Sequence, residues 1–326
     1  MRALVVGLGS IGRRHLGNIR SVEPDAEIAV LRHSRSDAPP PEGADSVLYS
    51  IEDAIAFRPD VAFVCGPTSK HVEQSIALAD AGAHLFVEKP LATDVGGAEA
   101  IARAASRSGR SLIVGYNLHF LPSLLALKRE LETGAIGRVM TARAEVGQYL
   151  PEWRPNVDYR ETNSARAELG GGIEFELSHE IDYVGWLLGD AASVTAMFAK
   201  TSDLEIEGED TAELLLRMRS GAIASIHLDM TQRAATRTCR IAGTDGTLLW
   251  DGIEGRLTRY RPGEGWTTVH DGDGDRNQMY VREAEHVFAC ARGHESPAVG
   301  AADGVRAVRI AAAARAASAE GRSIAL

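Results

Sequence analysis

Three glycines stand close together near the start of the chain, in the stretch GLGSIG at residues 7–12. In this spacing the first glycine permits a sharp turn, the second lets an anion approach the backbone, and the third lets a helix pack closely on the preceding strand. Free N–H groups at the helix start would then face a pyrophosphate. An ordinary strand–turn–helix is the alternative to a dinucleotide site formed by Gly7, Gly9, Ser10, Ile11 and Gly12.

A charged pair, Glu88 and Lys89, follows the apolar run AHLFV and precedes Pro90. Ligands of open α/β sheets bind beyond the carboxyl ends of the strands, so both side chains would lie beside a cofactor cleft. An ammonium group at Lys89 can contact cofactor and substrate, polarise a substrate oxygen and stabilise alkoxide charge as hydride leaves. The alternative is a surface lysine whose stem lies beside Glu88.

His179 opens the helix-like run HEIDYVGWLLGD. An imidazole there can take a hydroxyl proton during oxidation and return it during reduction near neutral pH. On the residues alone, a buried structural histidine bonded to a backbone carbonyl is the better interpretation.

A long loop at residues 147–172 contains three aromatic residues, two prolines and several arginines. Loops of this length usually have a function. Trp153 and Tyr159 can stack on the apolar faces of a sugar, and Arg154, Arg160 or Arg166 can hold a carboxylate or phosphate. A solvent-exposed loop at a dimer contact is the alternative interpretation.

The second apolar run ends in VLRHSRS, with no acidic residue between Leu31 and Ser36. An acid at this place accepts hydrogen bonds from the ribose of NAD and repels the 2′-phosphate of NADP. Here Arg32 or Arg35 can pair with that phosphate and Ser34 can donate to it. The pattern favours NADP over NAD, and the alternative is a solvated loop on an NAD enzyme that lacks the acidic anchor.

Three further residues follow the run VAFVCG and are expected beside the cofactor, namely Pro67, Thr68 and His71. The alternative for His71 is a residue at a helix N-terminus without ligand contact.

The elements that would position these residues change type along the chain. Up to about Tyr116, continuous apolar runs alternate with helical patterns, which predicts a parallel sheet with helices on both faces. Beyond it, strand-like segments joined by tight turns predict a mostly antiparallel sheet, with GTDG at 243–246 as a hairpin turn. Two helices, about Tyr280–Arg292 and Ala302–Glu320, and a short strand complete the chain.

Composition bounds the kind of protein. The chain has 326 residues, 44% of them hydrophobic and 25% charged, which is ordinary globular usage. A net charge of -10 argues against nucleic-acid and anionic-membrane partners. The cysteines Cys65, Cys239 and Cys290 are far apart, so we expect reduced thiols in a cytoplasmic protein, with no metal site. No apolar run is long enough for a signal peptide or a membrane span.

Four motifs together carry a resemblance. GLGSIG, Glu-Lys-Pro, GYNLHF at 115–120 and GGGIEFELSHEIDYVGWLLG at 170–189 resemble the Gfo/Idh/MocA family, the relatives of glucose–fructose oxidoreductase and inositol dehydrogenase. The resemblance covers nearly the whole chain. It implies a dinucleotide-binding Rossmann domain at 1–118 and a substrate-binding, oligomerising α+β domain at 119–326 with a large open sheet. It also implies that Lys89 and His179 are catalytic. In relatives the Lys–Pro peptide is often cis, so the resemblance implies a cis peptide between Lys89 and Pro90.

The chain departs from the family near the histidine. Many relatives have aspartate four residues before it, where this chain has Phe175. A subgroup has the acid three residues before, which corresponds to Glu176. Asp182 shares a helical face with His179. We assign Glu176 to substrate contact and Asp182 to support of the imidazole, both within the catalytic group.

The GYNLHF motif contains a second departure. Relatives often carry arginine where this chain has His119, which we interpret as a helix-entry residue rather than a substrate ligand. Asn117 matches the family and is expected near the nicotinamide or the substrate.

The resemblance implies hydride transfer between NADP or NAD and a hydroxyl or keto carbon of a sugar, polyol or sugar derivative. The alternatives are a nicotinamide-dependent glycosidase of the same family, separable by net cofactor turnover, and a non-catalytic nucleotide-binding regulator. An open sheet with one uncovered face also predicts a homodimer or homotetramer through the second domain.

Overall fold

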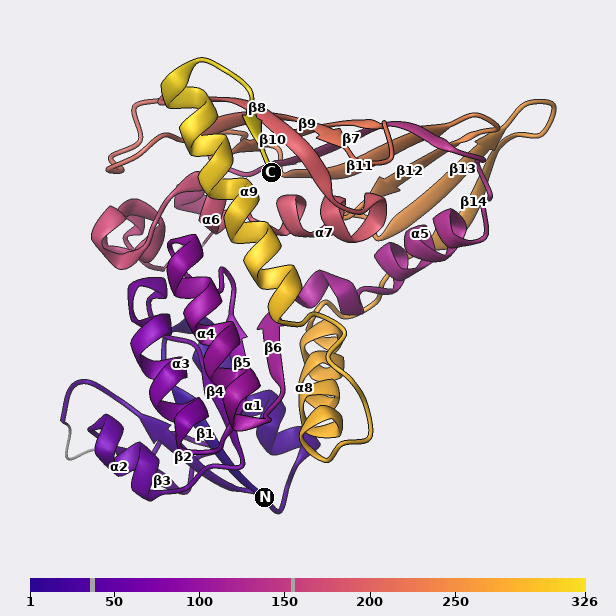
Figure 1. Ribbon diagram of the computed structural model, residues 1–326. Coiled ribbons are helices and arrows are strands. Elements are labelled where there is room, and N and C mark those ends of the chain that lie inside the picture. Colours follow the sequence, from indigo (N-terminus) through magenta and orange to yellow (C-terminus); the bar gives the residue numbers. More distant parts are fainter. Residues whose placement is uncertain (36–38, 154–155) are drawn as a thin grey trace. The chain divides into compact units, whose positions relative to one another are not determined.

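The chain folds into two compact units (Figure 1), seen in a computed structural model that describes residues 1–35, 39–153 and 156–326. The first unit comprises Met1–Asn117 and Asn277–Val308, and the second comprises Leu118–Arg276 and Arg309–Leu326. The range 119–326, expected to form one domain, therefore includes a segment that packs within the first unit. Arg154, one of the loop arginines, and Ser36, at the end of the run VLRHSRS, lie outside the described residues.

The first unit is built on a six-stranded sheet with the order β3-β2-β1-β4-β5-β6, and every neighbouring pair of strands is parallel. From β1 the chain proceeds outward to β2 and β3 and then returns to β4 on the other side. This reversal creates a crevice at the carboxyl ends of β1 and β4, where ligands of such sheets bind. The strands are β1 Arg2–Val6, β2 Glu27–Leu31, β3 Ser46–Leu48, β4 Val61–Val64, β5 His84–Glu88 and β6 Leu112–Gly115.

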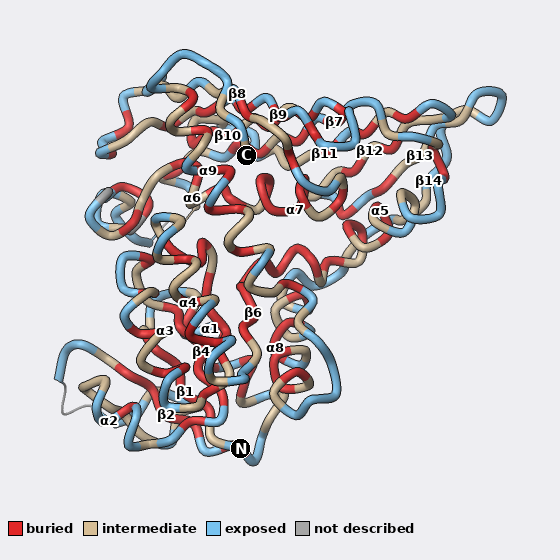
Figure 2. Tube along the Cα trace, viewed as in Figure 1, coloured by how far each residue is buried: buried red, intermediate tan, exposed pale blue. Residues whose placement is uncertain are grey.

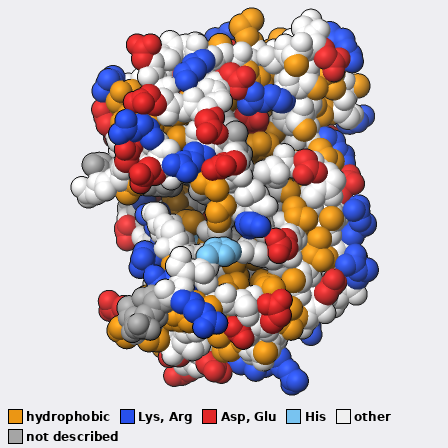
Figure 3. Space-filling view, turned by 90° about the vertical axis from the view of Figure 1, so that its left-hand side faces the viewer, with side chains coloured by type: hydrophobic (Ala, Val, Ile, Leu, Met, Phe, Trp, Pro, Cys, Tyr) orange, Lys and Arg blue, Asp and Glu red, His pale blue; other side chains and the backbone are white. Residues whose placement is uncertain are grey.

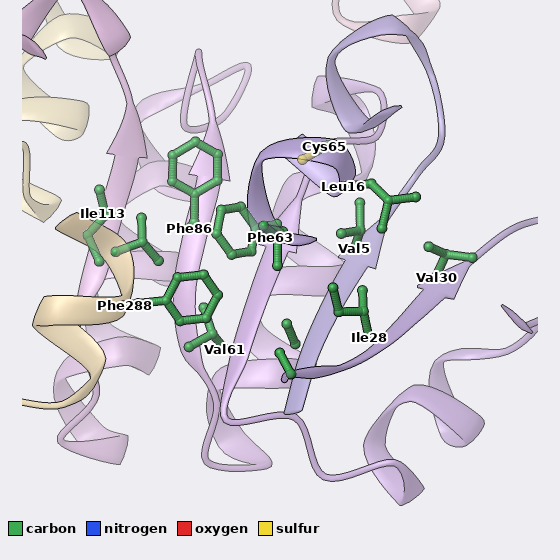
Figure 4. Close-up of a cluster of buried hydrophobic side chains, with 14 of the residues drawn as sticks. Val5, Leu16, Ile28, Val30, Val61, Phe63, Cys65, Phe86, Ile113 and Phe288 are labelled. Carbon is green, nitrogen blue, oxygen red and sulfur yellow. The ribbon is translucent and has the colours of Figure 1, made fainter. Parts of the chain in front are cut away.

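Helices cover both faces of this sheet. Because βαβ crossovers are right-handed, the reversal puts α1 on one face and α3 and α4 on the other. The core on the α1 side joins Phe63 and Phe86 of the sheet to Phe288 of α8 (Figure 4), and Figure 2 shows these strands as largely buried. The helices are α1 Ser10–Val22, α2 Ile51–Ala56, α3 His71–Asp80, α4 Val95–Ser108 and α8 Asn277–Ala291. The predicted doubly wound parallel sheet is confirmed.

The second unit contains a nine-stranded sheet with the order β14-β13-β12-β11-β7-β10-β9-β8-β15. Only the pair β7 and β10 is parallel, so the prediction of a mostly antiparallel sheet is confirmed, and residues 243–246 form the turn between β11 and β12. The strands are β7 Val139–Gly147, β8 Ala191–Ala199, β9 Thr211–Met218, β10 Ile223–Asp229, β11 Thr236–Gly243, β12 Thr247–Asp251, β13 Arg256–Arg261, β14 Gly265–Asp271 and β15 Ile324–Ala325.

The two faces of this sheet differ. The helices α5 Pro122–Glu132 and α7 His179–Leu188 cover one face (Figure 1), together with the short α6 Ile173–Glu176, while α9 Ala301–Glu320 reaches β8 through a bond from the Phe198 N–H to Ser318. Cross-strand partners on the opposite face run from Ile223 through β7, β11 and β12 to Tyr260 and Trp266. Leu215 on this face is 51% exposed and Trp266 is 49% exposed.

Candidate cofactor and catalytic site

The glycine loop follows β1 at the crevice of the first unit. A Cβ on Gly12 would lie 2.0 Å from the Gly7 carbonyl oxygen, and one on Gly7, whose φ is +88°, would lie 2.9 Å from Gly66 Cα. A Cβ on Gly9, in contrast, would meet no heavy atom within 4 Å. Packing therefore demands the first and third glycines, whereas the second leaves open space beside the backbone.

The 13-residue helix α1 begins at Ser10 in this loop, with Gly9 as its N-cap. No side chain caps it, and its first turn holds no acidic residue. The first N–H groups, including those of Ser10 and Ile11, have no partner within the helix, and the helix dipole is positive at this end. The residues present thus fit the pyrophosphate of a nicotinamide dinucleotide.

The ends of β4 and β5 are tied together by His71 at the start of α3. Its Nδ1 lies 3.0 Å from the Pro90 carbonyl oxygen and its Nε2 lies 3.1 Å from that of Gly66. Burial lowers the pKa of His71, although the two carbonyl oxygens oppose the shift. Its ring nitrogens thus face backbone oxygens, while Pro67 and the buried Thr68 begin the turn that precedes it.

Glu88, at the end of β5, has a buried partner on α1. Its Oε1 lies 2.7 Å from His15 Nε2, and its Oε2 accepts a hydrogen bond of 3.1 Å from the Lys89 backbone N–H. His15 is fully buried. This bond connects the helix of the glycine loop to the base of Lys89, and the Lys89–Pro90 peptide is cis, as the resemblance implies. His15 was missed as a site residue, although a histidine in the apolar stripe with Ile11 and Ile19 was a usable signal.

The end of β2 carries two guanidinium groups. Arg32 is partly buried and its backbone N–H donates to the Leu48 carbonyl oxygen at 3.0 Å. Arg35 is exposed, with its guanidinium carbon 5.8 Å from the centroid of the Tyr49 ring. Ser34 is exposed between them. This cationic turn follows a strand next to β1.

In the second unit, His179 is the first residue of α7 and is half-buried. The buried Asp182 Oδ2 lies 2.7 Å from the Nε2 of His119, whose ring centroid is 4.1 Å from that of Trp186. His119 is thus more than a helix-entry residue, because it is the buried partner of a candidate catalytic acid. The arginine that relatives often carry here was a usable signal, since it also suits an acidic partner.

Glu176 ends α6, immediately before α7, and its Oε2 accepts a hydrogen bond of 3.0 Å from Ser164 Oγ. Asn117 is buried at the end of the first unit. The structure therefore gathers Glu176, His179 and Asp182 along adjacent turns of one unit, whereas Lys89 and the glycine loop belong to the other.

The described residues of the long loop form four short 3-10 turns, with Leu150, Trp153, Tyr159, Thr162 and Ser164 around a small hollow. The indole N–H of Trp153 donates to the Gln148 carbonyl oxygen at 2.9 Å, and the hydroxyl of Tyr159 accepts from the Glu205 N–H at 3.2 Å.

The loop arginines have partners of their own. Arg160 Nη2 lies 2.7 Å from Asp158 and its Nη1 lies 3.2 Å from Glu205, all at the surface. Arg166 Nε donates to the Arg160 carbonyl oxygen at 3.3 Å. Local pairs thus occupy the Arg160 guanidinium that was expected to hold an anionic substrate group.

Residues 1–35, 39–153 and 156–326 contain no group of three His, Cys, Asp or Glu side chains able to hold a metal ion. Within the same residues, no helix is long and apolar enough to cross a membrane. All three cysteines are buried and free of disulfides.

A doubly wound parallel sheet with an uncapped helix N-terminus at its crevice, joined to an open-sheet unit, defines a two-unit dinucleotide-binding oxidoreductase. Residues 1–116 match the model of the oxidoreductase family with an NAD-binding Rossmann fold, and residues 128–326 match that of its C-terminal alpha/beta domain. The chain belongs to the Gfo/Idh/MocA oxidoreductase family. It is a nicotinamide-dependent enzyme.

Known proteins resemble it along its full length. The myo-inositol 2-dehydrogenase of Thermotoga maritima is 28% identical over 100% of this chain and 98% of its own. The WlbA dehydrogenase of Bordetella pertussis, solved with NADH and UDP-GlcNAcA, is 25% identical with a TM-score of 0.81, covering 100% of this chain and 97% of its own. A levoglucosan dehydrogenase solved with NADH and levoglucosan has a TM-score of 0.87 over 100% of this chain and 99% of its own, and at 21% identity shows the shared fold.

Proposed function

We propose that this enzyme transfers a hydride between a nicotinamide cofactor and a hydroxyl or keto carbon of a sugar, polyol or sugar derivative. The observation that carries the proposal is Lys89 at the carboxyl end of β5, with its base held by the His15–Glu88 pair. It stands on the same sheet edge as the glycine loop, whose second glycine leaves open space. The relatives named for inositol and levoglucosan support this substrate class.

Each residue of the proposed site has a separate role in hydride and proton transfer. A bound nicotinamide supplies the hydride acceptor or donor. The Lys89 ammonium donates to the substrate oxygen and stabilises its alkoxide charge. His179 takes the hydroxyl proton during oxidation and returns it during reduction. Glu176 accepts from a neighbouring substrate hydroxyl.

Two buried groups complete the site. Asp182, held by His119, fixes the first turn of α7 and with it the His179 side chain. Asn117 contacts the nicotinamide or the substrate. Trp153 and Tyr159 offer their ring faces to the sugar, because backbone groups hold their polar ends.

NADP is the preferred cofactor in this proposal. Arg32 pairs with the 2′-phosphate, Ser34 donates to it, and Arg35 adds a second positive charge. No acidic residue between Leu31 and Ser36 repels the phosphate.

The working form is a homodimer or homotetramer joined through the uncovered face of the nine-stranded sheet. Exposed apolar side chains on that face, Met197, Leu215, Ile223, Tyr260 and Trp266, support the assembly.

The experiment is a screen of polyols, aldoses, uronates and nucleotide sugars with NAD and NADP, measured by the absorbance of the reduced cofactor. The proposal expects net formation of reduced cofactor with at least one sugar or polyol. Turnover of a glycoside without net cofactor change contradicts it in favour of a glycosidase, and no turnover in either direction contradicts it altogether.

A further inference from the structure

A cavity of about 550 Å³ lies within the second unit, lined in part by Ser164, the hydrogen-bond partner of Glu176. Its walls come from the chain before α6, from α6, from the loop between β8 and β9, and from α9. Small-molecule sites usually have volumes of about 300–1,000 Å³. Figure 3 views the molecule from the side of these segments and shows acidic and basic side chains mixed together there.

A fixed ion network forms one wall of the cavity. The guanidinium of Arg315 donates to both oxygens of Glu174, with distances of 3.0 Å from Nε and 2.7 Å from Nη2, and its Nη1 donates to Glu209 at 2.5 Å. Glu174 is only 3% exposed. These bonds use three of the five N–H groups of Arg315, which leaves two for a ligand.

The other walls provide both donors and acceptors. Lys200 Nζ donates to the Ile206 carbonyl oxygen at 2.9 Å and keeps two N–H groups for a ligand. Ser164 donates to Glu176 through its Oγ–H, and the lone pairs of this oxygen can accept from a ligand. Glu209 uses one carboxylate oxygen for Arg315, and its other oxygen can accept.

The charge of the lining discriminates between ligand classes. The lining contains three carboxylates and two cations, which gives it one net negative charge. The carboxylates are Glu174, Glu207 and Glu209, and the cations are Lys200 and Arg315. Such a lining disfavours phosphate, sulfate and carboxylate groups. Hydroxyl groups, which both donate and accept, suit the mixed lining without adding charge.

Ser164 connects this cavity to the proposed substrate site. It lines the cavity and bonds to Glu176, and it also borders the hollow beside Trp153 and Tyr159. A polar chamber next to aromatic side chains matches a saccharide, which has apolar ring faces and hydroxylated edges.

We infer that the cavity is a subsite for a neutral, hydroxylated group attached to the substrate, such as a second sugar ring. The enzyme therefore prefers a glycoside or oligosaccharide over the free monosaccharide. The inference rests on the proposed function, because it extends the site in which Glu176 contacts the substrate.

The test compares glucose, galactose, mannose and myo-inositol with their glycosides, their α- and β-linked disaccharides, and their phosphorylated and uronate-linked derivatives, all as substrates of the full-length enzyme. Gly208→Leu fills the cavity, because Gly208 lines it and a Cβ there meets no heavy atom within 4 Å. Gly17→Leu, on the exposed side of α1, is the matched control, since its Cβ also meets nothing within 4 Å. Lys200→Met removes one donor without adding bulk.

The wild type is expected to have a KM about tenfold lower for an extended substrate than for its monosaccharide. Gly208→Leu should raise the extended-substrate KM about tenfold or more, with monosaccharide kcat/KM unchanged within about twofold. Lys200→Met should shift the same ratio in the same direction, and Gly17→Leu should leave it unchanged.

Other results would overturn the inference, and each identifies which part of it is wrong. Monosaccharide turnover without preference for any extended substrate refutes the subsite and leaves the proposed function intact. An equal effect of Gly208→Leu on both substrate classes, or no effect, refutes the assignment of this cavity. A preference for phosphorylated or uronate-extended substrates refutes the neutral ligand class. No turnover of any sugar removes the proposed function and the subsite together.

Discussion

Gly9→Ala should separate cofactor binding from folding. Gly9 has φ −66° and ψ −172°, an extended conformation that alanine adopts readily, and its added methyl meets no heavy atom within 4 Å. No side-chain cap is lost. We therefore expect the free energy of unfolding to stay within about 1 kcal/mol of wild type.

The methyl group would, however, occupy the space where the pyrophosphate approaches the start of α1. A backbone N–H holds an oxygen at about 2.9 Å, whereas a methyl carbon keeps other atoms at about 3.5–4.0 Å. The loss of one charge-assisted hydrogen bond costs about 1.5–3 kcal/mol, which is about ten- to a hundred-fold in Kd. Both NAD and NADP should be affected, because they share the pyrophosphate.

The assay is fluorescence titration of each cofactor together with thermal unfolding of the same samples. Gly17→Ala in the same helix is the control and should keep wild-type affinity, since its Cβ also meets open space. Gly12→Ala should instead destabilise the fold, because its Cβ would lie 2.0 Å from the Gly7 carbonyl oxygen. Wild-type cofactor affinity in a folded Gly9→Ala enzyme would refute the pyrophosphate assignment.

Three further predictions follow from other parts of the molecule. Arg32→Ala should weaken NADP binding about ten- to a hundred-fold and leave NAD binding nearly unchanged, measured by titration of both; equal losses contradict the phosphate contact. Leu215→Glu on the uncovered sheet face should dissociate the oligomer in sedimentation velocity, whereas Ile55→Glu on α2 should not; a wild-type monomer at micromolar concentration contradicts the assembly. Hydrogen bonds from Asp229 and Glu213 raise the pKa of His227 from 6.5 to about 9, so its stabilising effect is complete below 6.5 and lost as the pH rises through 9. The Tm advantage of wild type over His227→Gln should shrink across that range, and a constant difference refutes the pairing.

Much of the fold was predictable because its signals are local. The continuous apolar runs of β1, β4 and β5 predict buried parallel strands without any knowledge of their neighbours. The short strand β3 and helix α2 were missed because each carries little periodic signal. The strand has three partly buried residues, and the six-residue helix buries only Ala54. The hairpin of β13 and β14 was also missed, for a tertiary reason. Arg259 points toward the helix-covered face and pairs with Glu130 of α5 at 2.7 Å, so an arginine stands where the pattern requires an apolar residue.

In the candidate site, too, local motifs were predictable from the sequence and long-range pairs were not. The glycine spacing and the motif around Lys89 are readable within a few residues. The pairs that hold the site join residues far apart in the chain, 73 positions between His15 and Glu88 and 63 between His119 and Asp182. Polar residues within apolar segments indicate buried hydrogen-bonded pairs, but only the fold identifies the partner of each residue.

In the proposed reaction, Lys89 acts on the substrate oxygen during hydride transfer. This role is tested by the single-turnover rate of reduced-cofactor formation by Lys89→Ala, with saturating cofactor and the best substrate from the screen. We expect a rate about 10²–10⁴-fold below wild type, with the cofactor Kd nearly unchanged. A rate near that of wild type, or a loss explained wholly by weaker cofactor binding, would contradict it.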